Sequence, residues 1–246
     1  MEIEPILILI IFTTLIQSVI GVGILVIGTP LLLILNFHIT DVIANLLPLS
    51  ILTNSINLIF QKKILYEKID DIMKRINSFF FYCVPSILIG IATLKIIDNQ
   101  INLNLFIGLI ILLSVYLKMF NKIQFLEKNN RFFMSVIGLI HGITNSGGTL
   151  LSVFLIEQKN NQLTRVNVHF FYLLLASIQL LFFLLFFGFK QIIVFNYFLH
   201  FFLIILILSI LGNYISKKIS FKFFNTIVFL MALITSVFLI FKEIII

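Results

Sequence analysis

The chain has little charge and almost none of the residues that build disulfide-bonded or metal-centred domains. Only 11% of its 246 residues are charged, against roughly 25% in soluble domains. Its one cysteine, Cys83, excludes an internal disulfide and belongs to no metal-ligand pattern, so we expect no metal and no cofactor. Because 61% of the residues are hydrophobic and several apolar runs are long enough to cross a bilayer, the composition excludes a soluble protein.

Further absences narrow the function. The sequence has no phosphate-cradling glycine-rich motif, which excludes ATP hydrolysis by this chain. No Asp or Glu lies in the middle of an apolar run, so a carboxylate proton relay is not supported. No nucleophile is placed with a base and an orienting carboxylate, so we expect no enzymatic activity. The net charge of +7 lies mostly in the connections, where it reports membrane topology rather than a nucleic-acid partner.

Glycine is scarce, and its positions are clustered. Of the 11 glycines, three lie within residues 21–28 and four within residues 138–148. The second cluster interrupts an apolar run over residues 132–156 and also contains a His, an Asn, a Ser and two Thr. Glycine costs a helix about 1 kcal/mol relative to alanine, and irregular backbone at bilayer depth must be covered by protein or water. We therefore expect both segments to be broken helices, which form the binding sites of many transporters.

Eight apolar segments are predicted to span the membrane, at about residues 6–35, 42–60, 78–97, 103–120, 132–156, 168–189, 192–211 and 223–241. The first and fifth carry the glycine clusters, and the second and sixth carry a polar stripe at helical spacing. Pro85 and Gly90 are expected kink points in the third span. Residues 61–77 predict an interfacial helix, and residues 157–167 predict a polar loop.

This order predicts an all-α integral membrane protein with about eight transmembrane helices in two four-helix repeats, residues 1–121 and 122–246, which form one membrane domain. An offset of about 124 residues places Gly23 on Gly147. Four spans are an even number, so we expect the two repeats to be parallel, related by an axis along the membrane normal. With every segment crossing once, eleven Lys and Arg fall on the side of the termini and six on the other, which places both termini in the cytoplasm.

Both interrupted segments carry a short sequence motif. The first has Gly21-Val22-Gly23-Ile24-Leu25 followed by Pro30-Leu31-Leu32, and the second has Gly138 to Gly148 followed by Thr149-Leu150-Leu151. These motifs resemble the G-x-G-G-G and Pro-Leu-Leu pattern of the TauE/SafE sulfite-exporter family of membrane permeases, although the first lacks the triple glycine and the second lacks the proline. The resemblance covers nearly the whole chain. It implies an inner-membrane exporter of sulfite, sulfonate, sulfoacetate or related small sulfur anions.

The candidate binding site lies at the two breaks. The free N–H groups at the start of a half-helix attract an anion, and glycine lets the backbone approach it closely. We expect the two breaks to converge near mid-membrane, with side chains of the two striped spans lining the same cavity. The candidate substrate-binding residues are Gly21, Gly23, Asn54, His141, Gly142, Asn145, Ser146, Gly147, Gly148, Thr149 and Gln179.

Structural interpretations of these residues stay open. Glycine clusters also form where helices pack closely, and Asn54 and Gln179 would serve equally well as hydrogen bonds between helices. His141 is either a titrating group that faces the anion or a neutral residue bonded to a carbonyl freed by the break. His200 is expected at mid-membrane and His169 near a membrane interface.

Two other functions remain: transport of another small anion or metabolite, and a membrane accessory role without transport. The repeated interruptions favour transport, because an accessory protein needs no polar backbone at mid-membrane. The direction of transport, the coupling ion and a homo-oligomeric state are open.

Overall fold

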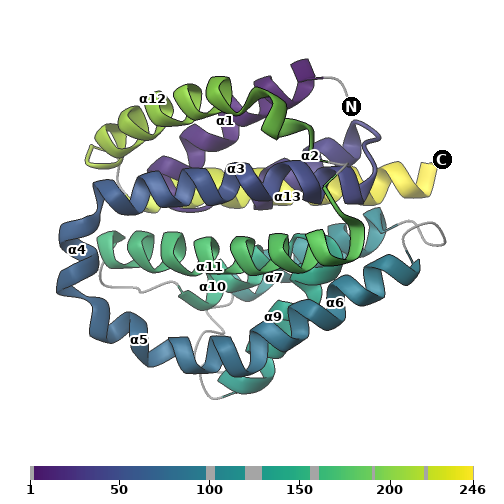
Figure 1. Ribbon diagram of the computed structural model, residues 1–246, viewed down its shortest axis with the longest axis horizontal. Helices are drawn as coiled ribbons and strands as arrows, with labels where there is room; N and C mark the ends of the chain where they lie inside the picture. Colours follow the sequence, from purple (N-terminus) through teal and green to yellow (C-terminus); the bar gives the residue numbers. More distant parts are fainter. Residues whose placement is uncertain are drawn as a thin grey trace.

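The chain folds into a bundle of helices, most of which run along one common direction (Figure 1). The computed structural model describes residues 3–97, 103–119, 129–155, 161–189, 192–218 and 221–245, and every regular element within them is a helix. Four helical stretches have the length and composition of a membrane span, with shorter apolar helices beside them: Ile39–Phe60, Ile69–Ile97, Gln162–Phe187 and Phe198–Ser216. The predicted all-α class is confirmed, and the chain is a multi-pass membrane protein.

The elements follow the predicted order closely. The first half of the chain contains α1 (Ile3–Ile20), α2 (Ile24–Ile34), α3 (Ile39–Phe60), α4 (Lys62–Glu67), α5 (Ile69–Ser78), the π-helical turn η1 (Phe79–Cys83), α6 (Val84–Ile97) and α7 (Asn104–Met119). The second half contains α9 (Asn130–Thr144), α10 (Gly147–Leu155), α11 (Asn161–Phe187), the 3₁₀ turn η2 (Ile193–Tyr197), α12 (Phe198–Ser216) and α13 (Phe221–Ile245). Both glycine-rich segments are broken, as predicted, between α1 and α2 and between α9 and α10.

The first break reverses the chain into a helical hairpin. Gly21 adopts φ +103°, a conformation that only glycine reaches without strain. A Cβ placed on Gly23 would lie 2.8 Å from the Cβ of Gln17, and one on Gly28 would lie 3.2 Å from a methyl carbon of Leu9. Later residues of α2 therefore contact earlier residues of α1, so α2 runs back along α1 towards the N-terminus.

The second break has the same geometry. Asn145 has φ +61°, in the left-handed region that asparagine tolerates best among residues with a side chain. A Cβ on Gly147 would lie 2.6 Å from the Cβ of His141, and the rings of Phe133 and Phe154 stack further along the hairpin. The prediction that each interrupted segment crosses the membrane once is therefore wrong, because each returns to the end of the bundle from which it starts.

The two hairpins enter the bundle from opposite ends. At the open end of the first, the Lys242 ammonium of α13 donates to the carbonyls of Leu33 and Ile34. At the open end of the second, the Arg75 guanidinium of α5 lies over the ring of Phe154. The C-terminus and α5 lie at opposite ends of the molecule (Figure 1). Each half thus contains one hairpin and three further helical stretches. The two hairpins point in opposite senses, whereas the predicted parallel repeat would point them the same way.

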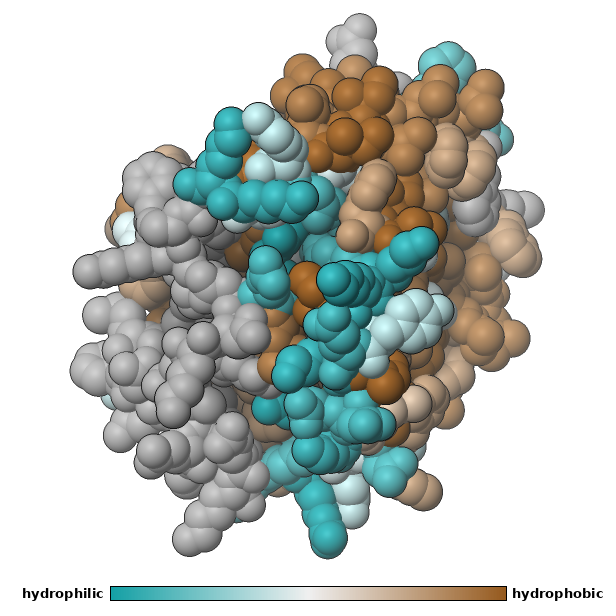
Figure 2. Space-filling model, turned by 90° about the vertical axis from the view of Figure 1, so that its left-hand side faces the viewer, coloured by the Kyte–Doolittle hydropathy of each residue, from teal (hydrophilic) through white to brown (hydrophobic). Residues whose placement is uncertain are grey.

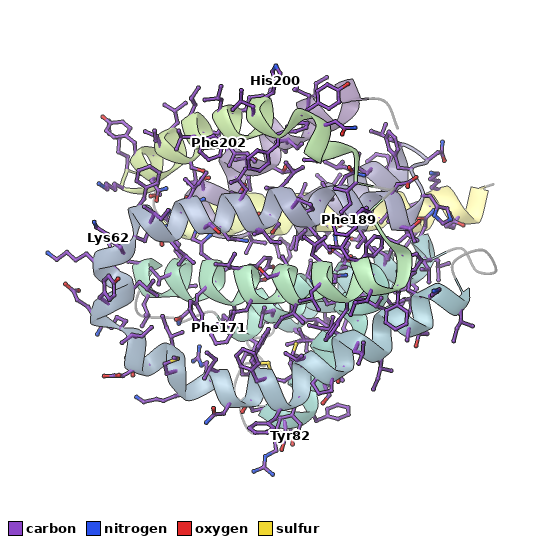
Figure 3. All side chains as sticks on the ribbon, in the orientation of Figure 1. Lys62, Tyr82, Phe171, Phe189, His200 and Phe202 are labelled. Atoms are coloured by element: carbon purple, nitrogen blue, oxygen red, sulfur yellow. The ribbon has the colours of Figure 1, made fainter. Side chains whose placement is uncertain are left out.

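Smaller differences between the predicted and the observed elements have local causes. The predicted loop over residues 157–167 is helical from Asn161 onward, because its polar side chains bond to other helices. The segment preceding the third span forms two short helices, and the π turn η1 comes just before Pro85, which cannot donate to the preceding turn. Gly90 lies inside the continuous helix α6, where its backbone approaches α9. His200 lies in the first turn of α12 and points away from the bundle (Figure 3).

Candidate functional site

The tip of the second hairpin gathers buried polar groups inside the bundle. His141, Thr144, Asn145 and Ser146 have no exposed surface. The hydroxyl of Thr144 accepts a hydrogen bond from the Ser146 amide at 3.1 Å, which satisfies one backbone donor at the break. The first N–H groups of α10 have no intrahelical acceptor, so the tip presents a partial positive charge towards its surroundings.

Several polar atoms at this tip lack a partner. Neither ring nitrogen of His141 has a hydrogen bond, although the side chain is completely buried. Asn145 Oδ1 and Gln179 Oε1 are also buried without a partner. A buried polar atom left unsatisfied costs about 1–3 kcal/mol, and such atoms call for an explanation. A polar ligand that binds among these three side chains would provide one.

Hydrogen bonds hold these three residues together. The carbonyl of His141 accepts hydrogen bonds from the backbone N–H of Asn145 and from Gln179 Nε2, both at 2.8 Å. Asn145 Nδ2 donates to the hydroxyl of Thr29 on α2 at 2.9 Å, so the second hairpin reaches the first inside the bundle. The tip therefore joins α9, α10 and α11 to the first hairpin around one group of unsatisfied atoms.

The backbone of α10 is closely covered on its other side. The Tyr172 hydroxyl of α11 donates to the carbonyl of Gly148. A Cβ on Gly148 would lie 2.8 Å from that hydroxyl, so only glycine fits there. The Thr149 hydroxyl bonds to Ser114 on α7, beside a small hollow between α2, α7, α10 and α13.

The tip of the first hairpin is polar, and the amides of Gln17 and Asn54 have partners there, although His169 Nε2 has none. Gln17 Oε1 accepts from the Ile24 amide at 2.8 Å and so takes up the free donor at the start of α2. Gln17 Nε2 and His169 Nδ1 both donate to Asn54 Oδ1 at 2.9 Å, and Asn54 Nδ2 donates to the Ser50 hydroxyl. Gln17 corresponds to His141 at the offset of 124 residues. The two tips differ because the glutamine finds partners, whereas the histidine has none.

The comparison with known proteins agrees with a transport role. A sequence model of the family described as "Sulfite exporter TauE/SafE" matches residues 6–239, nearly the whole chain. The chain belongs to this family. Membership makes it a membrane transporter of the sulfite-exporter type. No curated protein and no solved structure matches the chain.

Some predicted site residues of this TauE/SafE protein lie in contacts between helices. A Cβ on Gly142 would lie 2.9 Å from the Cα of Gly90, which brings the backbones of α9 and α6 together. Gly212 of α12 approaches Ser18 of α1 in a similar way. Gly21 packs against Val168 of α11. Gly142 and Gly21 thus have the packing role that small residues have between membrane helices.

The structure brings His141, Asn145 and Gln179 of this TauE/SafE protein together with Ser146 and Gly147, while Asn54 lies in the network at the first tip. Sequence reasoning missed Gln17, although it is a lone amide in an apolar segment. It also misplaced His169, which is fully buried rather than interfacial, because the start of α11 was predicted too late.

Proposed function

We propose that this chain is a secondary transporter that exports small sulfur-containing anions and binds them at the tip of the second hairpin. The observation that carries the proposal is the set of unsatisfied buried atoms on His141, Asn145 and Gln179. In a bilayer-spanning bundle such a set is expensive unless a ligand or water satisfies it. A transporter needs a site of this kind, which stays polar without a substrate.

The chemistry of the tip suits a protonated or hydrated oxyanion. The start of α10 supplies backbone N–H donors and a favourable dipole, and an imidazole N–H of His141 adds a side-chain donor. Asn145 Oδ1 and Gln179 Oε1 are acceptors, so they receive a hydrogen from the ligand or from its bound water. Hydrogen sulfite offers both acceptor oxygens and a proton. The absence of a permanent positive charge from this cluster keeps binding weak enough for release.

We further propose that residues 1–121 and 122–246 are inverted repeats. The matched hairpins support this, as do the equivalent helix contacts: α9 packs on α6 as α1 packs on α12, and α3 packs on α11 near the centre. Inverted repeats allow one architecture to open to either side of the membrane, because exchanging the conformations of the two halves exchanges the open side.

The charges of the connections support an orientation with both termini outside. With the hairpins returning, the Lys and Arg whose side chains the structure describes at the α4 end are Lys62, Lys63, Lys68, Lys74, Arg75, Arg131, Arg165, Lys217 and Lys218, while those at the opposite end are Lys95 and Lys242. Hydrophilic residues gather across the α4 end (Figure 2). The positive-inside rule then places the α4 end in the cytoplasm. The expectation of cytoplasmic termini assumed that each glycine-interrupted segment crosses the membrane once.

Sulfite efflux from proteoliposomes tests the proposed function. We expect sulfite-loaded liposomes that contain the purified chain to release sulfite faster than sulfite-loaded liposomes without protein. His141→Gln should lower the rate about tenfold, the effect expected from losing one hydrogen bond to a charged ligand, and Asn145→Ala should also lower it.

His200→Gln is the matched control, because His200 is exposed at the start of α12. Equal rates for His141→Gln and His200→Gln would reject the site. Absence of flux for sulfite, sulfonate and sulfoacetate in folded protein would reject the substrate class.

A further inference from the structure

A second polar cavity lies at the basic end of the molecule, away from the tip of the second hairpin. Its volume is about 260 Å³. The polar side chains that line it come from the end of α3, the start of α11 and the end of α12: Gln61, Gln162, Arg165, Asn213, Ser216 and Lys217. One water molecule takes about 30 Å³ of liquid, so the cavity has room for a small anion with several waters.

Arg165 is the main charged group of this cavity. Its guanidinium donates to the Ser216 hydroxyl and to the Ser18 carbonyl, both at 2.7 Å, and to Asn213 Oδ1 at 3.2 Å. All three acceptors are neutral, and the buried Arg165 Nε has no partner. These bonds hold the guanidinium in place without neutralising its charge. A largely buried charge that is not neutralised is costly, so an anion in the cavity would be stabilised there.

Two further features favour an anion. Lys217 lines the same cavity and adds a second cation at its rim. Arg165 also connects the cavity to the first hairpin, because it donates to the carbonyl of Ser18, three residues before Gly21 at the break. A planar guanidinium binds oxyanions through paired N–H groups. The arrangement thus joins a hydrogen-bonded arginine, an exposed lysine and neutral amides at the end of the bundle that carries most of the basic residues.

We propose that this cavity is a capture site where the exported sulfur oxyanion first binds from the cytoplasm. The identity of the ligand and the direction rest on the proposed function, whereas anion binding in the cavity does not. The anion binds between Arg165 and Lys217 and then passes the first hairpin on its way to the second.

A competing role for Arg165 is purely structural. Its bond to the Ser18 carbonyl stabilises the C-terminal end of α1, where a cation is favoured by the helix dipole. That role predicts a loss of stability when Arg165 is changed, but no change in anion affinity. Lys217 has no such bond among the described contacts, so its substitution separates the two roles.

A single fluorescent reporter measures binding. The chain has no Trp, so Tyr214→Trp, at the wall of the cavity, gives one emitting residue. We expect a saturable change in emission on titration with sulfate and with methanesulfonate, and none with gluconate. In this background Arg165→Lys should weaken binding about tenfold, because it loses the paired donors. Lys217→Gln should weaken it about threefold, as expected for an exposed charge.

Lys63→Gln is the matched control, since Lys63 is exposed at the same end but does not line the cavity. No saturable signal, or one affinity for all variants, would overturn the capture site. A lower melting temperature for Arg165→Lys with unchanged affinity in both cavity variants would also overturn it. If the expected affinities appear but liposomes release no sulfur anion, the capture site stands and the proposed function fails. If liposomes release sulfur anions, the KM of Lys217→Gln equals that of the wild type and the reporter shows no binding, the proposed function stands and the capture site fails.

Discussion

Replacing Gly147 by alanine tests the hairpin directly. A Cβ at this position would lie 2.6 Å from the Cβ of His141 and 2.7 Å from its backbone nitrogen, and neither atom can move without moving α9. Overpacking of this kind costs about 1–3 kcal/mol. Gly23→Ala meets the equivalent backbone around Gln17 and should cost a similar amount. Because the clash displaces His141, we expect Gly147→Ala also to lower the rate of sulfite efflux.

Gly28→Ala, on the same hairpin as Gly23, is the matched control. The nearest atoms to its added Cβ are methyl carbons of Leu9 and Leu46 at 3.2 Å, and these side chains can shift. Alanine also improves helix propensity by up to about 1 kcal/mol, so the stability should change little. The assay is the melting temperature of each variant in detergent, followed by efflux from liposomes. If Gly147→Ala melts and transports like Gly28→Ala, α10 does not fold back on α9 as described.

Three other predictions concern the rest of the bundle. Asn54→Leu leaves buried donors of Gln17 and His169 without an acceptor, at about 1–3 kcal/mol each, so its melting temperature should fall clearly; an unchanged value would contradict the network. Lys242→Met removes a cation from the end of α2, worth about 0.3–1 kcal/mol, and should lower the melting temperature slightly, whereas an increase would speak against that contact. Alkaline phosphatase fused to the C-terminus should be active, because the proposed orientation places that terminus outside. Bright fluorescence of a green fluorescent protein fused there would reject the proposed orientation.

The sequence contained enough information to locate the helices and the breaks. Hydrophobic run length determines where a helix is buried, and clustered glycines weaken it locally, so both interruptions could be predicted. The direction of the chain after a break could not. Whether α2 continues α1 or returns along it depends on contacts such as Gly23 against Gln17, which bring together residues outside any local pattern. The expectations of a parallel repeat and of cytoplasmic termini both depended on the direction that the chain takes after each break.

The candidate site was predicted in part. The polar residues at the second break could be identified because polar groups are rare inside apolar spans. The role of each glycine could not, since a glycine that contacts a ligand and one that contacts a helix look alike in sequence. Gly142 illustrates this, because only the position of Gly90, 52 residues earlier, shows that it lies in a helix contact. The start of α11 was missed because Arg165 and its neighbours have the composition of a loop, although their partners keep them helical.

The close contacts of Gly142 with Gly90 and of Gly212 with Ser18 have a mechanical consequence. In each case a hairpin from one half of the chain rests on a long helix from the other half. Any rigid body that these contacts define therefore contains segments of both halves. If the chain were expressed as two polypeptides separated between the halves, neither hairpin would have its support until the two pieces had assembled, so each half depends on the other to fold.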